Sequence, residues 1–280
     1  MIQPAFDIGN DQVNLENASL LMEVGEKFFN YIIYQHDPKQ LLRVRQYNLE
    51  STLDKNIQEL LEEIIAGDPL LNEPVKEKVI LYNFPESSLV PESHFDIGMN
   101  KSVTQVVYGD AHKGLVLSEK IYGWDMYNIY RIPKAIHTLF QSRFQAGKYW
   151  HFYSLLLSSL NNAGILTGTV IRLVFYNDKF VAAFFSGGQL KMLQTFTYET
   201  PEDAAYYLLL MCRHFEVDQH NAALQISGLI DGQSALYAEI LKYFPVVEYE
   251  GVPDTFNTED ILTEYPAHYF SPLLKMSLCV

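Results

Sequence analysis

The side chains that could do chemistry in this sequence do not fall into a known catalytic or metal-binding motif. Cys212, His214 and His220 lie close together in the chain, but they do not make the ligand set of a zinc site. We expect His214 to interact instead with the negative end of a helix dipole. The sequence has no phosphate-binding loop of the GxxxxGKS/T type and no GxSxG, HExxH or GxGxxG pattern. We therefore predict no metal site and no catalytic residue.

Two other groups of residues could bind an anion or act as acids. Gly187-Gly188 could cradle an anion, but it separates two β-rich runs, where a hairpin turn is the simpler interpretation. Glu202 and Asp203 follow Thr200-Pro201. That order is typical of a helix start, in which the acids face the positive end of the dipole. Both groups are better explained by structure than by catalysis.

The composition favours a folded protein with an acidic surface. The chain has 34 acidic and 20 basic residues, and its net charge of -14 repels a phosphate backbone, so we expect no nucleic-acid partner. The aromatic stretch 149–153 could stack on bases, but helix packing is the preferred interpretation. Cys212 and Cys279 indicate reduced thiols in a cytosolic protein. We predict a cytoplasmic location without membrane contact, because we find no signal peptide and no apolar run of about 20 residues.

The elements that would position these residues begin with two similar β-meanders. Residues 169–196 contain three β-rich runs, separated by turns at Asn177-Asp178 and Gly187-Gly188. Residues 20–49 repeat this arrangement, with Gly25-Glu26 and Asp37-Pro38 at the turns. A length of 280 residues allows two domains of moderate size. Two meanders in one chain suggest a duplicated lobe.

Helices and strands follow each meander in a similar order. Apolar periodicity and capping signals predict a weak helix over residues 90–99 and stronger ones over 53–66 (capped by Ser51 or Thr52), 134–144, 149–161, 201–215 and 233–244. Strands are predicted over 78–82, 102–108, 115–121, 127–132, 222–227 and 245–249. Residues 1–17 read as an irregular leading segment, and 268–279 as an apolar segment that packs back on the body. We place the lobes at 1–146 and 147–280.

Each half has the order β-β-β-α-β-α-β-α of a ribonuclease-H-like lobe. Two such lobes in tandem make the α/β architecture shared by actin, sugar kinases and heat-shock ATPases. Five further segments span nearly the whole chain: residues 20–34, Leu89-Val90-Pro91, Tyr130-Arg131-Ile132-Pro133, His268-Tyr269-Phe270 and Leu278-Cys279. In these the chain resembles a Bacteroidetes family of unknown function with an actin-like ATPase fold. The resemblance implies a fold and no established activity.

The resemblance also implies where a nucleotide would bind. In actin-like ATPases the first hairpin tip of each lobe holds phosphates through N–H groups and hydroxyls, and an acid-x-glycine triplet keeps an acid near the metal. Glu23-Val24-Gly25 has this form, but Glu26-Lys27-Phe28 offers no hydroxyl, and Glu26 would repel a phosphate that Lys27 would attract. We attribute two further triplets, Asp7-Ile8-Gly9 and Asp96-Ile97-Gly98, to chance, because neither ends a convincing strand before a hairpin.

The second lobe departs further from the pattern. In Phe175-Tyr176-Asn177 the acid is replaced by Phe175, and Asp178 again puts a carboxylate at the tip. Ser227-Gly228 keeps one glycine of the pair expected on the adenine side, and Asp231-Gly232 could cap the next helix. The candidate cleft residues of both lobes are therefore Glu23, Gly25, Lys27, Asn177, Ser227 and Gly228.

Three functional hypotheses follow. The leading one is a non-catalytic interaction or regulatory protein with a degraded nucleotide cleft, an unidentified protein partner and no cofactor, because the hydroxyl donors and the second-lobe acid are missing. The alternative is a divergent ATP-binding protein, ATPase or small-molecule kinase that uses ATP and Mg²⁺, with Glu23 near the metal and Ser227-Gly228 at the base. The third is a pseudoenzyme that closes on ATP without hydrolysing it.

Overall fold

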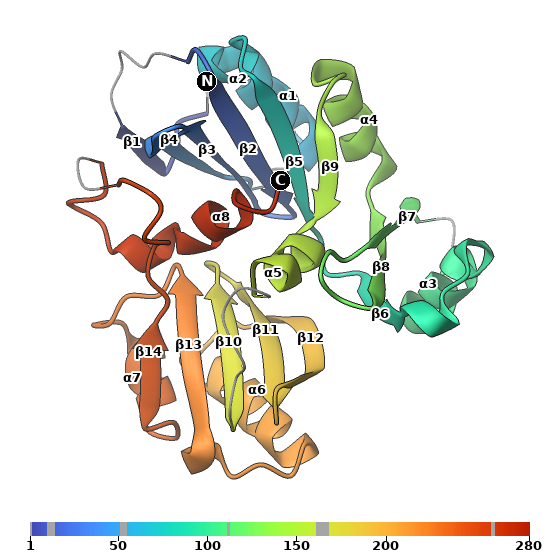
Figure 1. The fold of residues 1–280 in the computed structure, drawn as a ribbon, viewed down its shortest axis with the longest axis vertical. Coiled ribbons are helices and arrows are strands. Elements are labelled where there is room, and N and C mark those ends of the chain that lie inside the picture. Colours follow the sequence, from blue (N-terminus) through green and yellow to red (C-terminus); the bar gives the residue numbers. More distant parts are fainter. Residues whose placement is uncertain (1, 10–14, 51–54, 111–112, 161–167, 259–260) are drawn as a thin grey trace. The chain divides into compact units, whose positions relative to one another are not determined.

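The computed structural model describes residues 2–9, 15–50, 55–110, 113–160, 168–258 and 261–280, in two compact units (Figure 1). The first unit comprises residues 1–158, 254–263 and 279–280, and the second comprises 159–253 and 264–278. The predicted boundary after residue 146 differs from this division. Residues 148–151 add a parallel strand to the sheet of the first unit, and they therefore belong to that unit.

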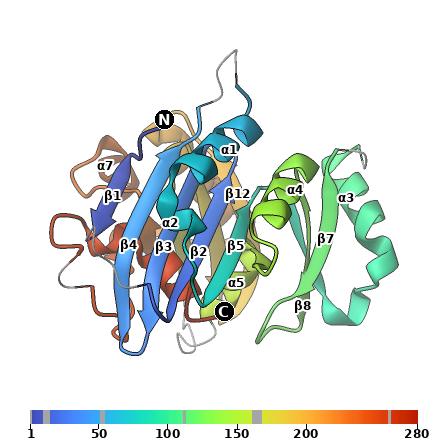
Figure 2. The same ribbon diagram turned by 90° about the horizontal axis from the view of Figure 1, so that it is seen from above.

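A six-stranded mixed sheet forms the centre of the first unit (Figure 2). Its spatial order is β1 (Phe6–Gly9), β4 (Lys39–Asn48), β3 (Phe28–His36), β2 (Ala18–Gly25), β5 (Glu77–Asn83) and β9 (Lys148–His151). Strands β2, β3 and β4 are the predicted antiparallel meander, whereas β5 lies parallel to β2 and β9 parallel to β5. The leading segment is not irregular throughout, because β1 pairs with the outer edge of β4.

Helices α1 (Ile57–Gly67), α2 (Pro69–Asn72) and α4 (Lys134–Arg143) share a core with this sheet. Leu61 of α1 and Phe140 of α4 pack with Met22 and other alternate residues of β2, which point to one face of the strand. The cap of α1 is Asn56, whose side chain accepts from the Glu59 N–H at 3.1 Å while Glu59 accepts from the Asn56 N–H at 2.8 Å. The predicted caps Ser51 and Thr52 lie outside the described residues.

A small three-stranded sheet completes the first unit. Its order is β6 (Ser87–Pro91), β8 (Met126–Ile132) and β7 (Leu115–Lys120), all antiparallel. The strand predicted over 102–108 is wrong, because these residues form helix α3 (Asn100–Tyr108). Their β-branched side chains favour a strand by propensity, but Thr104 is buried and its hydroxyl bonds to the Asn100 carbonyl one turn back. The weak helix predicted over 90–99 is replaced by two short 3₁₀ turns, Glu92–His94 and Ile97–Met99.

The second unit repeats the larger sheet of the first. Strands β12 (Gln189–Thr197), β11 (Lys179–Ser186), β10 (Thr169–Phe175), β13 (Ala222–Gly228) and β14 (Val246–Tyr249) lie in this spatial order. Helix α6 (Pro201–His214) is capped by Thr200 as predicted, with Asp203 accepting from the Thr200 N–H at 2.9 Å. Helix α7 (Ala235–Leu241), the 3₁₀ turns Gln219–Asn221 and Ala267–Tyr269, and helix α8 (Ser271–Met276) complete it. The C-terminal segment packs on the body as predicted, since most of α8 is buried.

The two units share one strand plan, which confirms the predicted duplication. In each unit an antiparallel meander is followed by two strands that extend the sheet in parallel from the first strand of the meander. The helix predicted over 149–161 is only partly right. Residues 149–151 belong to β9, and the helix α5 (Phe152–Leu160) begins directly after it.

A buried ionic network ties β1 and β4 to the start of α2. The carboxylate of Asp68 accepts from the hydroxyls of Tyr31 and Tyr47 at 2.7 and 2.8 Å, and from an Arg45 nitrogen at 2.8 Å. Arg45 also holds Asp7 of β1. Although burial opposes the shift, the hydrogen bonds from Arg45 and Arg43 lower the pKa of Asp7. Asp7-Ile8-Gly9 therefore has a structural role.

Candidate functional site

The first hairpin tip of the first unit contains the candidate Glu23. This residue is 2% exposed. One of its carboxylate oxygens accepts from the amide of Asn83 on β5 at 2.7 Å, and the other accepts from the amide of Asn30 on β3 at 3.2 Å. The carboxylate therefore cross-links three neighbouring strands, β2, β3 and β5. It is a satisfied buried acid of the kind that stabilises a sheet.

The surroundings of Glu23 offer few ligands for a metal ion. The Oδ1 atom of Asn30 is buried and has no hydrogen-bond partner among the described residues. Mg²⁺ in nucleotide sites is bound by one or two carboxylates together with waters and phosphate oxygens, and the Glu23 carboxylate of this tip is buried and bonded to Asn30 and Asn83. Within the described part of the chain, no three His, Cys, Asp or Glu side chains come close enough to bind a metal ion together. The residues present do not fit a magnesium site at this tip.

The other two candidates of the first unit lie at the same tip. Gly25 ends β2, and a Cβ atom placed there would lie 2.5 Å from the ring of Phe28. The Phe28 ring thus covers the backbone that a phosphate would have to approach. Lys27 is exposed, and its carbonyl accepts from the Leu49 N–H at 2.8 Å. The structure brings Glu23, Gly25 and Lys27 together, but only Lys27 presents a polar side chain to solvent.

The corresponding tip of the second unit is closed by aromatic rings. Phe175, which stands where the acid would be, is fully buried, and its ring centroid lies 5.5 Å from that of Phe180. The hydroxyl of Tyr198 donates to the Tyr176 carbonyl at 2.8 Å, and its N–H donates to the Asp178 carbonyl at 3.0 Å. Asn177 is exposed at the turn. This tip is a packed hairpin whose carbonyls are held by Tyr198.

Ser227 and Gly228 end the neighbouring strand β13. The Ser227 hydroxyl is buried and donates to the Leu173 carbonyl at 3.2 Å. Gly228 has a φ of +79°, and a Cβ placed on it would lie 2.2 Å from the carbonyl oxygen of Phe175. Beyond them, α7 is capped by Ser234, although Asp231 does accept from the Gln233 N–H at 2.6 Å. The hydroxyl of Ser227 therefore bonds within the sheet, and Gly228 allows two strands to approach closely.

Sequence reasoning missed a buried polar cluster at the start of α5. Glu119 of β7 accepts from the His151 N–H at 2.9 Å and from the Tyr130 hydroxyl at 3.1 Å. Burial raises the pKa of Glu119 to about 7, against the opposing effect of hydrogen bonds from Ser154, His151 and Tyr130. The imidazole of His151 is fully buried, with Nε2 bonded to the Phe84 carbonyl. Because these residues come from three strands and a helix, no local sequence pattern marks them.

The titration of Glu119 gives a testable pH dependence. A carboxyl whose pKa is raised in the folded state keeps a proton that the unfolded chain releases, so the free energy of unfolding should fall as the pH rises from about 4.5 to about 7. Glu119→Gln lacks this titration, so its free energy of unfolding should fall by roughly 2 kcal/mol less than that of the wild type over that pH range. Urea denaturation at a series of pH values measures the difference. The control Glu73→Gln, at an exposed acid, should keep the wild-type slope, and an unchanged slope in Glu119→Gln would contradict the prediction.

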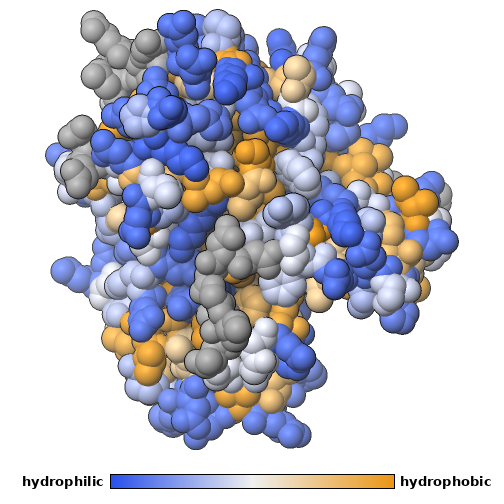
Figure 3. All heavy atoms as spheres, viewed as in Figure 1, coloured by the Kyte–Doolittle hydropathy of each residue, from blue (hydrophilic) through white to orange (hydrophobic). Residues whose placement is uncertain are grey.

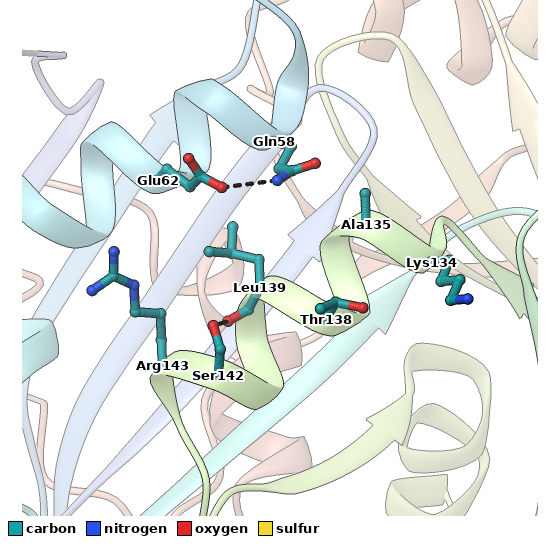
Figure 4. Close-up of a pocket in the computed structure, with 8 residues that line it drawn as sticks. All are labelled: Gln58, Glu62, Lys134, Ala135, Thr138, Leu139, Ser142 and Arg143. Atoms are coloured by element: carbon teal, nitrogen blue, oxygen red, sulfur yellow. Dashed lines mark hydrogen bonds between the residues drawn. The ribbon is translucent and has the colours of Figure 1, made fainter.

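Two adjoining hollows lie on the first unit beside α4. A groove between α1 and α4 is lined by Gln58 and Glu62 on α1 and by small side chains such as Thr138 and Ser142 on α4 (Figure 4). Gln58 donates to Glu62 at 2.8 Å across one turn of α1. The second hollow is a pocket of about 390 Å³ that begins where the groove ends, and Lys134 lines both. Residues far apart in the sequence line this pocket, so the sequence analysis did not predict it.

Exposed large hydrophobic side chains occur in both units. On the face drawn in Figure 3, hydrophobic residues form separate patches among hydrophilic ones. The most exposed large hydrophobic residues are Val106 of α3, at 86%, and Tyr122, at 81%. In the described residues we find no helix that is both long and apolar enough to span a bilayer.

Comparison with known proteins identifies the family. The profile described as "Protein of unknown function (DUF3822)" matches residues 7–247. The chain belongs to the DUF3822 family. A solved protein from Bacteroides thetaiotaomicron, described as having an actin-like ATPase fold and unknown function, matches this DUF3822 chain with a TM-score of 0.74 and 16% identity. That match covers 88% of this chain and 95% of the other. No curated protein matches the sequence.

Two further solved structures share the fold at lower identity. The PilM-PilN type IV pilus biogenesis complex matches with a TM-score of 0.64 and 9% identity, over 93% of the DUF3822 chain and 98% of the other. The ethanolamine utilization protein EutJ from Carboxydothermus hydrogenoformans matches at 0.50 and 8% identity, over 97% and 92%. At these identities the likeness shows the fold alone. The DUF3822 protein has the predicted α/β actin-like ATPase fold, built from two ribonuclease-H-like lobes.

Proposed function

We propose that this DUF3822 protein is a non-catalytic interaction or regulatory protein, a cytoplasmic Bacteroidetes pseudoenzyme that binds no nucleotide, on an actin-like ATPase scaffold. One observation carries the proposal: both oxygens of the Glu23 carboxylate accept from the buried amides of Asn30 and Asn83. An acid that is to approach a metal ion must be accessible to it, whereas Glu23 is 2% exposed and both of its carboxylate oxygens bond to neighbouring strands. Here the acid of the first tip bonds to the sheet instead.

The second unit supports the same proposal. Phe175 is fully buried where an acid would be needed, and the Ser227 hydroxyl bonds to the backbone of β10. Neither tip, residues 23–28 or 175–180, contains a serine or threonine whose hydroxyl could bind a phosphate. The pilus complex named above shows that a protein of this fold takes part in an assembly with another protein. A protein partner and the absence of a nucleotide cofactor are therefore both part of the proposal.

A calorimetric titration of the purified protein with Mg-ATP tests the proposal. We expect no heat of binding at millimolar nucleotide and no release of phosphate. Binding without turnover would favour a nucleotide-binding pseudoenzyme. Phosphate release that disappears in Glu23→Gln, with the circular dichroism spectrum unchanged, would instead support the divergent ATPase or kinase and overturn the proposal.

A further inference from the structure

The pocket beside the start of α4 has an apolar floor and a charged rim. Phe84 and Ile132, which are 4% and 1% exposed, contribute to its lining. The side chains of Lys113, Lys134 and Glu26 also line it, and all three residues are exposed. A hollow of about 390 Å³ can take one or two side chains of a peptide. It therefore combines a hydrophobic contact surface with charges at its edge.

The charges in the pocket are not equivalent. The guanidinium of Arg131 pairs with Glu86 and also donates to the carbonyls of Gly109 and Asp110 at the end of α3, at 3.2 and 2.5 Å. Arg131 is thus fully used within the fold. Lys113 and Lys134, in contrast, form no ion pair with any of the described acidic residues. Two unpaired cations on a chain of net charge -14 make this pocket a local exception to its acidic surface.

We propose that this pocket binds a short acidic peptide segment of a partner protein. An apolar side chain of the peptide packs on Phe84 and Ile132, and a neighbouring carboxylate interacts with Lys113 and Lys134. Opposite charge at an interface favours both encounter and register. The inference rests on the proposed function, because it names the kind of partner that a protein-interaction role requires.

The groove along α4 gives the peptide a path beyond the pocket. It shares Lys134 with the pocket, and Arg143 lies at the opposite end of the helix (Figure 4). Helix α4 has 10 residues and is therefore about 15 Å long. An extended peptide covers that length with roughly four or five residues. The small exposed side chains of Thr138 and Ser142 leave room for its backbone.

Glu26 carries a negative charge that limits which anions the pocket can bind. Its exposed carboxylate lines the pocket at the tip of the first hairpin, so it repels an anion that binds on its side. A polyphosphate, which carries negative charge along its whole length, would meet this carboxylate. A peptide can instead place a single carboxylate by the lysines and an apolar side chain on Phe84 and Ile132, so it brings less negative charge to the pocket. This arrangement favours an acidic peptide over a phosphate group.

Selection from a display library of random short peptides on the full-length protein tests the inference. We expect enriched sequences in which Asp or Glu adjoins an apolar residue. Fluorescence polarisation with one such synthetic peptide should show about tenfold weaker binding to the double variant Lys113→Glu/Lys134→Glu. Glu26→Gln should bind the same peptide two- to threefold more tightly, roughly the effect of removing one nearby like charge.

The control is a double variant with the same change of charge elsewhere. Lys101→Glu/Lys191→Glu alters two exposed lysines that do not line the pocket, and it should bind the peptide as the wild type does. Failure to select a binder, selection of neutral or basic peptides, or equal weakening in both double variants would overturn the inference. Nucleotide binding in the calorimetric test would overturn the proposed function instead, so the two failures are distinguishable.

Discussion

Asp68→Ala should destabilise the first unit by about 3–5 kcal/mol, the usual result of removing one partner from a buried ion pair. Asp68 is 3% exposed, and its two oxygens accept from Tyr31, Tyr47, Arg45 and the N–H of Leu70. After the substitution two tyrosine hydroxyls and one side of a guanidinium would lose their buried acceptor. Asp68→Asn keeps an acceptor of the same shape and should lose less.

Tryptophan fluorescence during guanidinium denaturation measures this loss of stability in the first unit. Both tryptophans of the chain, Trp124 and Trp150, lie in the first unit. Glu63→Ala serves as the control, because it breaks the solvent-exposed Lys55–Glu63 pair, which should contribute far less than the buried network. A shift of similar size in Asp68→Ala and Glu63→Ala would show that the buried network adds little stability.

Gly228→Ala should destabilise the second unit by about 3 kcal/mol, through backbone strain and overpacking together. Gly228 combines a φ of +79° with a Cβ position 2.2 Å from the Phe175 carbonyl oxygen. That oxygen is backbone in a paired strand, so it cannot move aside without disturbing β10. The strain and the steric contact have different physical causes and can be separated.

Gly187→Ala provides the comparison that separates them. Gly187 also has a positive φ, of +57°, but a Cβ there would meet nothing within 4 Å. Its substitution should cost only about 1 kcal/mol, from strain alone. Hydrogen exchange of peptides from β10 and β13 reports the stability of the second unit. Equal protection in the two variants would mean that the close approach of the strands at Gly228 is not rigid.

The fold was predictable where local signals agree with tertiary structure. The paired turns at Gly25-Glu26 and Asn177-Asp178 and the cap at Thr200 lie where the structure has them, because turn and cap chemistry acts over a few residues. The strand predicted over residues 102–108 follows from the preference of Val and Thr for that state. The packing of α3 against the small sheet, with Thr104 buried, overrides this preference. The helix predicted over 149–161 wrongly includes Tyr149 and Trp150. These residues form a strand by pairing with β5, about 70 positions earlier, and no local pattern indicates that pairing.

The sequence predicts where the candidate cleft residues lie in the fold, but it does not predict which side chains surround them. The acid-x-glycine pattern places Glu23 at the end of a strand, as observed. It does not show that Asn30 and Asn83 reach across from two neighbouring strands to bind the carboxylate. The pocket could not be predicted from the sequence for the same reason, since its lining combines residues near positions 26, 85, 113 and 132. Side chains that meet only through the topology leave no local trace in one sequence.

The division of the chain has a consequence for its synthesis. Residues 254–263 belong to the first unit, where Asn257 accepts from the Leu41 N–H at 3.1 Å and donates to the Lys39 carbonyl at 2.9 Å. The ring of Phe256 lies 5.9 Å from that of Tyr34. A ribosome releases these residues only after the whole second sheet has been made. The nascent first unit must therefore wait with one edge of its meander incomplete until the second sheet has been made, and the second unit in turn waits for its own residues 264–278.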